Sequence, residues 1–327
     1  ARARIACRAG LDTAARWIKL EPDWTTTVPN GLDPCDIPDD VLTVFNLGRR
    51  SVSFDGYRLQ ASTNIERDWR EGSNNWVVAP QRTSTGRPIL ANDPHRAHGV
   101  PSLRYISHLV APGMNVIGAG EPALPGISIG HNDRIAFGLT IFAIDQADLY
   151  VYELNEKGQY RYGDGWESVS TLVETVPVRG AEDREISMAF TRHGPVVYRD
   201  DERAFAIRLG FLEPGMAPYF GSVEYMRASN WREFVGALNR WGTPSENQVY
   251  ADIDGNIGYK PAGLFPRRPN WDGLLPVPGD GRYEWDGFHD MDVLPVEFNP
   301  DRGFTGTANS MNLPADYPID RNKVSFE

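Results

Sequence analysis

The sequence predicts a sheet-rich α+β fold whose antiparallel strands form two layers. Short runs of β-branched and aromatic residues recur between Asn75 and Tyr259, and Gly, Asp or Asn turns separate them. One segment stands out as a helix. The strand candidates are too many to pair within a single small sheet, so we expect two packed sheets.

The strand candidates follow one another with clear turn signals. Thr85-Gly86, Gly163-Asp164-Gly165 and Asp254-Gly255-Asn256 each lie between two apolar runs and predict hairpins. In chain order the candidates are 76–78, 88–91, 103–110, 115–118, 127–129, 135–142, 149–154, 160–162, 171–178, 186–191, 196–198, 204–209, 249–252 and 257–259.

The predicted helix begins at a capping box. Asn230 precedes Glu233 by three residues, and apolar residues then recur at helical spacing up to Trp241. Gly242 and Pro244 end the pattern.

Residues 1–72 differ from the remainder in composition and in hydrophobic pattern. Short helices are conceivable at 14–20 and 36–45, several prolines interrupt the segment between them, and residues 52–69 show no sustained period. This pattern indicates a wrapped or linker-like segment. The chain begins Ala1-Arg2 without Met, and we expect a fragment of a longer protein, so localisation cannot be read from it.

Composition excludes several classes of protein. The 327 residues include 41% hydrophobic and 11% aromatic residues, which excludes disorder as the overall state. A net charge of −11 gives no indication of a nucleic-acid-binding surface. No apolar run approaches the roughly 18 residues of a membrane span. Cys7 and Cys35 are too few for a disulfide scaffold, and either free or paired thiols remain open.

The Gly72-Ser73-Asn74-Asn75 stretch carries the chemistry. Taken alone, it is typical of a turn before a strand. The alternative is cleavage after Gly72, which makes Ser73 an N-terminus. Serine normally needs an external base, and an α-amine with a pKa of roughly 7.7 to 8.0 can accept the hydroxyl proton.

Ordered motifs favour cleavage. The chain contains Ser73-Asn-Asn-Trp-Val-Val, Leu90-Ala-Asn-Asp-Pro-His95, Leu124-Pro-Gly-Ile-Ser-Ile-Gly-His-Asn132, Tyr250-Ala-Asp-Ile-Asp-Gly-Asn-Ile-Gly258 and Thr307-Ala-Asn-Ser310. From Ser73 to about Pro318 it resembles the penicillin acylase family of N-terminal nucleophile (Ntn) hydrolases. The resemblance implies an αββα sandwich of two antiparallel sheets. It also implies that residues 1–72 are the end of the α chain plus a spacer, and that 73–327 are a C-terminally incomplete β-chain core.

The resemblance also implies a catalytic set. Ser73 matches the nucleophile, and its own amine matches the base. His95 matches the position that orients this amine. The backbone amide of Ile141 and the side chain of Asn309 match the two donors of the oxyanion hole. Without the resemblance, His95 would be a turn residue after Asp93-Pro94, Ile141 a buried strand residue and Asn309 a loop cap.

Five further residues match positions of the acyl pocket. The charge of Arg96 and the carboxylate of Glu246 argue against a purely benzyl-binding pocket, so acyl specificity stays open. The five matched positions are Arg96, Ser128, Ile129, Ala143 and Glu246.

Two aspartates match a structural calcium site. The resemblance implies that Asp145, Asp148 and the backbone carbonyls of Ala147 and Gly273 bind the ion, and oxygen ligands of this kind suit calcium. Asp320 is a further candidate, and the α-chain glutamate of the family would lie upstream of Ala1. Without the resemblance the aspartates would be solvated loop residues. No organic cofactor is expected.

Together these features predict hydrolysis of an N-acyl amide after autocatalytic cleavage at Gly72-Ser73. Substrates include β-lactam amides, acyl-homoserine lactones and related compounds, and the sequence does not choose among them. The family implies a heterodimer of α and β chains in the periplasm or outside the cell, with no nucleic-acid or membrane partner. Two alternatives stay open. One is an inactive or immature fragment, because the family's catalytic arginine would fall past Glu327. The other is a secreted, calcium-stabilised β-sandwich that binds glycans.

Overall fold

A computed structural model describes residues 51–55, 58–62, 72–96, 99–100, 102–122, 124–216, 219–320 and 324. The strands are β1 (Ser51–Asp55), β2 (Arg58–Ser62), β3 (Gly72–Val78), β4 (Ile89–His95), β5 (Tyr105–Ala111), β6 (Met114–Gly120), β7 (Ile129–Asn132), β8 (Ile135–Ile141), β9 (Ala147–Glu153), β10 (Tyr160–Tyr162), β11 (Gly165–Glu167), β12 (Ser170–Val176), β13 (Arg184–Thr191), β14 (Gly194–Arg199), β15 (Arg203–Leu209), β16 (Glu246–Asp252), β17 (Ile257–Ala262), β18 (Val277–Pro278), β19 (Glu297–Phe298) and β20 (Phe304–Thr307). The α-helices are α4 (Ser222–Tyr225) and α5 (Trp231–Leu238), and the 3-10 helices are η3 (Pro80–Arg82), η4 (Gly210–Leu212) and η5 (Met291–Val293).

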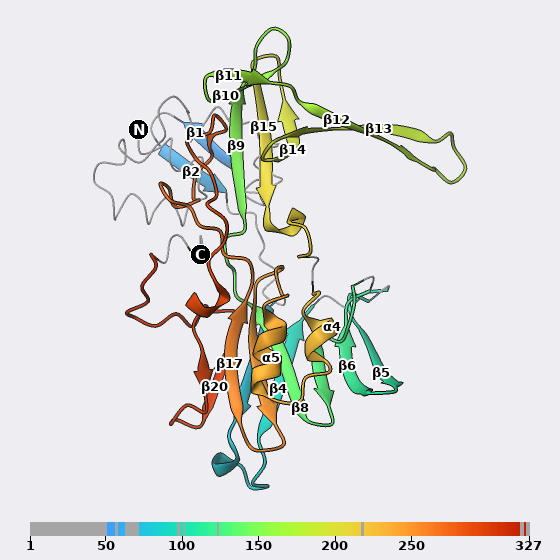
Figure 1. Ribbon diagram of the computed structural model, residues 1–327, viewed down its shortest axis with the longest axis vertical. Helices are drawn as coiled ribbons and strands as arrows, with labels where there is room; N and C mark the ends of the chain where they lie inside the picture. The colour runs from blue at the N-terminus through green and yellow to red at the C-terminus, as the bar shows by residue number, and fades with distance from the viewer. Residues whose placement is uncertain are drawn as a thin grey trace.

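Two antiparallel sheets form a sandwich in the lower half of Figure 1. One has seven strands in the order β19-β17-β16-β8-β7-β6-β5, and the other has three in the order β20-β3-β4. Apolar side chains of both sheets pack between them, including Val77, Val249, Ile257 and Tyr259. β4 approaches β8 so closely that a Cβ at Gly138 would lie 2.4 Å from Asn92 Oδ1. This close approach explains glycine in the middle of β8.

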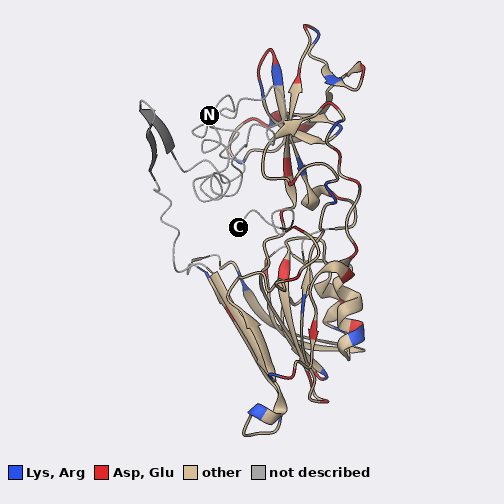
Figure 2. Cartoon of the chain, turned by 90° about the vertical axis from the view of Figure 1, so that its left-hand side faces the viewer, with Lys and Arg blue, Asp and Glu red and all other residues tan. Residues whose placement is uncertain are grey.

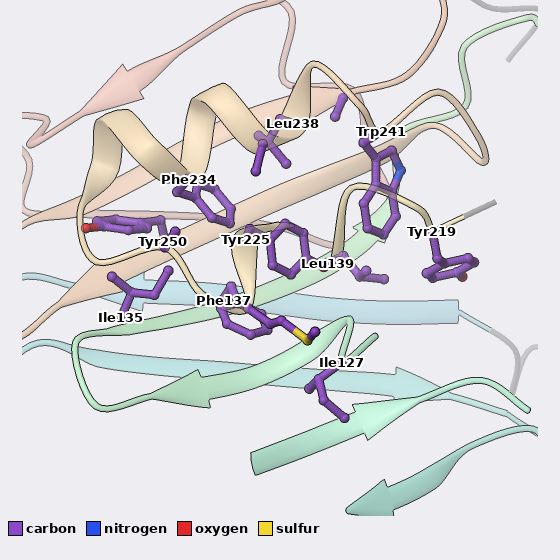
Figure 3. Close-up of a cluster of buried hydrophobic side chains, with 14 of the residues drawn as sticks. Ile127, Ile135, Phe137, Leu139, Tyr219, Tyr225, Phe234, Leu238, Trp241 and Tyr250 are labelled. Carbon is purple, nitrogen blue, oxygen red and sulfur yellow. The ribbon is translucent and has the colours of Figure 1, made fainter. Parts of the chain in front are cut away.

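Helices α4 and α5 cover the other face of the seven-stranded sheet (Figures 1 and 2). The side chain of Asn230 accepts a hydrogen bond from Glu233 N at 3.0 Å, which is the expected N-cap. Phe234 and Leu238 of α5 point toward Phe137 of β8 and Tyr250 of β16 (Figure 3). The sandwich is therefore layered as helices, a large sheet and a small sheet.

A separate sheet lies above the sandwich in Figure 1. Its six strands run in the order β12-β13-β14-β15-β9-β18, and β18 pairs with β9 in parallel. β12 and β13 extend from it as a long two-stranded arm. Residues 142–146 connect β8 of the sandwich directly to β9, so this short link joins the two sheets.

The predicted sheet-rich fold and its two-layered antiparallel strands are confirmed. Sequence reasoning missed α4, which is only four residues long. It also missed the short strands β18, β19 and β20, because the region after Pro261 is rich in Pro and Gly. It also predicted no strand in residues 52–69, where β1 and β2 form a hairpin. The helices expected at 14–20 and 36–45, and both cysteines, lie outside the described residues. Within the described part of the chain, none of the helices has the length and apolar character needed to cross a membrane.

Candidate active site

Ser73 lies near the amino end of β3, the central strand of the three-stranded sheet. Side chains alternate along a strand, and here Ser73, Asn75 and Val77 face inward while Trp76 is exposed. Ser73 is only 2% exposed. Gly72 belongs to the same strand, so the peptide bond between Gly72 and Ser73 is intact. The nitrogen of Ser73 is therefore an amide, and the structure corresponds to the uncut chain.

Asn309 reaches this peptide bond from β20. Thr307 of β20 pairs with Asn75 of β3 in antiparallel register, so the chain beyond Thr307 continues toward Gly72. A Cβ at Gly72 would lie 3.2 Å from Asn309 Nδ2. Asn309 has a φ of 66°, a left-handed conformation that asparagine tolerates better than most residues. Its Oδ1 is buried without a hydrogen-bond partner among the described residues.

His95 lies on the other side of Gly72. The two residues are paired in the β3–β4 register, and His95 Cδ2 is 3.7 Å from the position of a Gly72 Cβ. Its Nε2 lies 3.0 Å from Asn74 Nδ2, and its Nδ1 lies 3.3 Å from Asp93 Oδ1. His95 therefore lies beside Gly72, while its ring nitrogens contact Asn74 and Asp93 in the uncut chain.

Ile141 ends β8 and is 42% exposed. Its carbonyl accepts a hydrogen bond from Asn247 Nδ2 at 2.7 Å. The same amide group lies 3.3 Å from the carbonyl of Ser310, beyond β20, and Tyr259 donates to Asn247 Oδ1 at 2.6 Å. Asn247 is fully buried and links the strand of Ile141 to the turn of Asn309. Sequence reasoning missed it, because it lies in the polar Glu246-Asn247-Gln248 stretch before the strand predicted at 249–252 and belongs to no motif.

Arg96 follows His95 directly. Its Nη1 donates hydrogen bonds to the carbonyl of Gly72 at 3.0 Å and to the carbonyl of His95 at 2.7 Å. We call Gly72, Ser73, His95, Arg96 and Asn309 the nucleophile site. The fold brings these five residues together from three strand ends.

Glu246 is a buried carboxyl group on which the charge of Arg96 acts. It pairs with Ile141 in the β8–β16 register and is 3% exposed. Burial raises the pKa of Glu246 to about 8, while the charges of Arg104 and Arg96 act in the opposite direction. Arg104 itself forms an ion pair with Glu121 at 3.0 Å. Sequence reasoning did not identify Arg104 or Glu121.

The other three predicted pocket residues are positioned less directly. Ser128 is buried, and its carbonyl accepts a hydrogen bond from Tyr225 at 2.8 Å. Ile129 begins β7 and is half-buried. Ala143 follows β8 with a φ of 62°, an uncommon conformation for alanine. None of the hydrogen bonds among the described residues links these three to the nucleophile site.

Asp145 and Asp148 lie in and beside the link between β8 and β9. Arg268 Nε donates to Asp148 Oδ2 at 2.7 Å, and Arg268 Nη2 lies 3.3 Å from Asp145 Oδ2. Trp285 Nε1 also donates to Asp148 Oδ2. We call Asp145, Asp148, Arg268 and Trp285 the aspartate site. These residues are buried, which corrects the view of the aspartates as solvated loop residues.

The aspartate site contains two buried carboxyl groups and one guanidinium. Burial raises the pKa of Asp145 to about 7 and raises that of Asp148, although the charge of Arg268 acts against both shifts. Asp148 Oδ1 is buried and has no hydrogen-bond partner among the described residues. Gly273 lies alongside, since a Cβ there would be 2.8 Å from Asp145 Oδ2. Burial raises the pKa of Asp272, and the charge of Asp320 raises it further. The charge of Asp272 in turn raises the pKa of Asp145.

An oxygen-liganded cation is chemically compatible with this arrangement, because a buried carboxylate oxygen lacks a partner and two carboxylates share one guanidinium. The described residues contain no group of three or more His, Cys, Asp or Glu side chains arranged to hold a metal ion. A complete shell would thus include backbone carbonyls, such as those of Ala147 and Gly273, or ligands beyond the described residues.

Comparisons with known proteins agree with the motifs. The sequence matches the penicillin amidase family over residues 1–326. It is 37% identical to the penicillin acylase 2 proenzyme of Pseudomonas sp. (strain SE83), over 76% of this chain and 33% of that protein. It is 33% identical to the acyl-homoserine lactone acylase QuiP of Pseudomonas fluorescens (strain Pf0-1), over 76% of this chain and 31% of that protein.

The penicillin G acylase of Escherichia coli is 28% identical over 91% of this chain and 36% of its own length. The chain therefore spans about a third of the length of these curated relatives. The solved structure of the thermostable penicillin G acylase from Alcaligenes faecalis superposes with a TM-score of 0.69 at 31% identity, covering 77% of this chain and 46% of that one. Its fold, an Ntn-hydrolase sandwich, is the fold described above. On the family match and this shared fold, the chain belongs to the penicillin amidase family.

Proposed function

We propose that this chain is part of an acylase that hydrolyses N-acyl amides with Ser73 as its nucleophile, after cleavage of its own Gly72-Ser73 bond. The observation that carries the proposal is the convergence on this bond: His95 and Arg96 at the end of β4 and Asn309 just after β20 all lie against Gly72. Family membership supplies the reaction class. Family membership also argues against the alternative of a glycan-binding β-sandwich protein.

Cleavage would expose the α-amine of Ser73 beside its own hydroxyl. This amine can accept the hydroxyl proton while Oγ attacks the substrate carbonyl, since its ordinary pKa lies near neutrality. The negative charge that develops on the carbonyl oxygen needs donors within about 3 Å, and Ile141 N–H and Asn309 Nδ2 are the proposed pair. The buried Asn247 amide donates to the carbonyls of Ile141 and of Ser310, the neighbour of Asn309, and so supports both donors. Water then hydrolyses the acyl-enzyme.

The related proteins act on two kinds of N-acyl compound, as the names penicillin acylase and acyl-homoserine lactone acylase state. We propose a substrate from these classes. Arg96 and Glu246 match acyl-pocket positions of the family, and their polar groups support an acyl chain with hydrogen-bonding groups over a plain benzyl group. Cleavage divides the protein into an α and a β chain, and we propose that they remain associated as a heterodimer.

A structural calcium ion at the aspartate site is also part of the proposal. Asp145 and Asp148 would bind it through their carboxylates, with the carbonyls of Ala147 and Gly273 as further ligands. A ligand bound only by the folded state stabilises it by about 2.7 kcal/mol at a hundredfold excess over its Kd. On metal-containing protein, chelation should lower Tm and leave the turnover of surviving protein nearly unchanged. An unchanged Tm would exclude a stabilising ion.

The direct test is N-terminal sequencing of the purified full-length protein. We expect a chain that starts Ser73-Asn74-Asn75, and Ser73→Ala should leave this bond uncut. Ser84→Ala, at an exposed turn serine, is the matched control and should be cut normally. If Ser73→Ala is still split at residue 72 in a protease-free preparation, self-cleavage by Ser73 is wrong.

A further inference from the structure

The carbonyl of Gly72 already has a cationic donor in the uncut chain. Arg96 Nη1 lies 3.0 Å from Gly72 O and 2.7 Å from His95 O, so this one nitrogen bridges two backbone carbonyls on neighbouring strands. The hydrogen bond to His95 O holds Nη1 in the position from which it donates to Gly72 O. Arg96 is half-buried, which limits competition from water for the same carbonyl.

The predicted oxyanion donor does not make this contact. Asn309 Nδ2 lies beside the α-carbon of Gly72, and no hydrogen bond among the described residues joins it to Gly72 O. The nitrogens of His95 contact Asn74 and Asp93. The side-chain donor aimed at the carbonyl that Ser73 would attack is therefore the guanidinium of Arg96.

We propose that Arg96 is a catalytic residue of self-cleavage, holding the oxygen of Gly72 as it becomes an oxyanion, and that Asn309 serves mainly in later substrate turnover. This inference rests on the proposed cleavage at Gly72-Ser73 and divides its donors into two sets. One set acts on the chain's own carbonyl, and the other acts on the carbonyl of the substrate.

The step balances as follows. Ser73 Oγ bonds to the carbonyl carbon of Gly72, the oxygen of Gly72 takes the negative charge, and the bond from this carbon to Ser73 N then breaks. The hydroxyl proton ends on Ser73 N, which becomes the free amine. The product is an ester between Gly72 and Ser73 Oγ. Water hydrolyses it, so that Gly72 leaves as a carboxylate and Ser73 Oγ regains a proton.

Charge explains why an arginine suits the first step. A guanidinium remains charged throughout the physiological pH range, and hydrogen bonds from charged donors to oxyanions are stronger than neutral ones. Glu246 is the buried carboxyl group that acts electrostatically on Arg96, and its pKa of about 8 keeps it mostly protonated at neutral pH. The charge of Arg96 is therefore available to the Gly72 carbonyl.

The test is a time course of cleavage in freshly synthesised full-length protein, followed by gel mobility and mass spectrometry. The variants are Arg96→Met, Arg96→Lys and, as a matched control, Arg161→Met at an exposed arginine. Loss of one oxyanion donor typically slows a reaction about 10²-fold, and we expect this for Arg96→Met. Arg96→Lys should also be slowed at least roughly tenfold, because the shorter lysine side chain leaves its ammonium short of the position of Nη1. Arg161→Met should be cut at the wild-type rate.

Chemical rescue separates catalysis from folding. Added methylguanidine should accelerate cleavage of Arg96→Ala and leave the wild type unchanged, whereas hydroxylamine, which cleaves only the later ester, should not. If Arg96→Met does not fold, Arg96→Lys is the deciding variant. Cleavage of Arg96→Lys at the wild-type rate then overturns the proposal. Cleavage of folded Arg96→Met within twofold of wild type overturns it as well. A wild-type chain that is never cut at residue 72 refutes the proposed function itself, so the two failures are distinguishable.

Discussion

The nucleophile site and the aspartate site are both buried and polar, yet they are built in opposite ways. At the nucleophile site, donors from β4 and the turn after β20 surround one neutral peptide group, and Asn309 Oδ1 has no partner among the described residues. At the aspartate site, two carboxylates meet one guanidinium from a distant loop. The first arrangement leaves groups available for a reaction. The second pairs its carboxylates with one guanidinium and leaves Asp148 Oδ1 without a partner among the described residues.

The positions of the two sites in the fold match this difference. The nucleophile site lies at the ends of strands, where side chains reach beyond the sheet. The aspartate site lies in the link from β8 to β9, which joins the sandwich to the six-stranded sheet. Ile141 is the last residue of β8, only four positions before Asp145. We infer that the aspartate site fixes the exit of the strand on which Ile141 lies.

The largest expected effect concerns the guanidinium of the aspartate site. Arg268→Met would leave two buried carboxylates without their cation, and breaking a buried ion pair from one side costs about 3 to 5 kcal/mol. We expect a loss of this size in the free energy of unfolding, measured by denaturant titration in the presence of a chelator. Arg267→Met, at an exposed neighbour, should change stability by under about 1 kcal/mol.

Calcium sharpens this prediction. If the aspartate site binds the ion, added calcium should restore part of the stability of Arg268→Met, because a cation replaces the lost charge. An Arg268→Met protein as stable as the wild type in chelator would contradict the contrast drawn between the two sites.

The next effect is expected in catalysis rather than stability. Asn309→Ala removes a donor that matters chiefly in the transition state, so kcat should fall roughly 10² to 10³-fold while KM changes little. Steady-state kinetics on cleaved protein measure this. Asn312→Ala removes a hydrogen bond to Gly306 on the same turn and should leave kcat within a few-fold of wild type. A comparable loss in both variants would indicate that the turn matters and the Asn309 amide does not.

Sequence reasoning succeeded where one strand or one turn determines the structure. The strand at 76–78, the Asn230 cap and the Gly-containing hairpins depend on neighbours along the chain, and all could be predicted. Asn247, Arg104 and Arg268 were missed because their partners are distant in sequence: Arg268 lies 120 residues from Asp148, for example. β20 was missed because four residues in a Pro- and Gly-rich region carry no period, although its pairing with β3 brings Asn309 to Gly72.

Asn247 provides a smaller test of the nucleophile site. Asn247→Leu removes the amide that joins Ile141 O to Ser310 O and leaves those buried groups unsatisfied, at a cost of about 1 to 3 kcal/mol. We expect reduced stability and reduced kcat together, since both proposed donors lose a support. Tyr259→Phe removes only the hydroxyl that donates to Asn247 Oδ1 and should give a smaller change of the same kind. Thermal unfolding and kinetics on the same preparations compare the two. A Leu variant with normal kcat would separate Asn247 from catalysis.

The smallest expected effect is a pH dependence of the unfolding free energy that Glu246 causes. The folded protein raises the pKa of Glu246 from 4.5 to about 8, chiefly through burial, so the folded state holds this proton more tightly than the unfolded state. The resulting stability is fully present below about pH 4.5 and is lost as pH rises to about 8, with a slope of at most about 1.4 kcal/mol per pH unit. Glu246→Gln has no proton to lose, so its unfolding free energy should decline less than that of the wild type between pH 5 and pH 8. Denaturant titrations at several pH values, with Glu224→Gln at an exposed position as control, measure this difference. Parallel pH curves for wild type and Glu246→Gln would mean that Glu246 is ionised in the folded state, and Arg96 and Arg104 would then face a charged carboxylate instead of a neutral one.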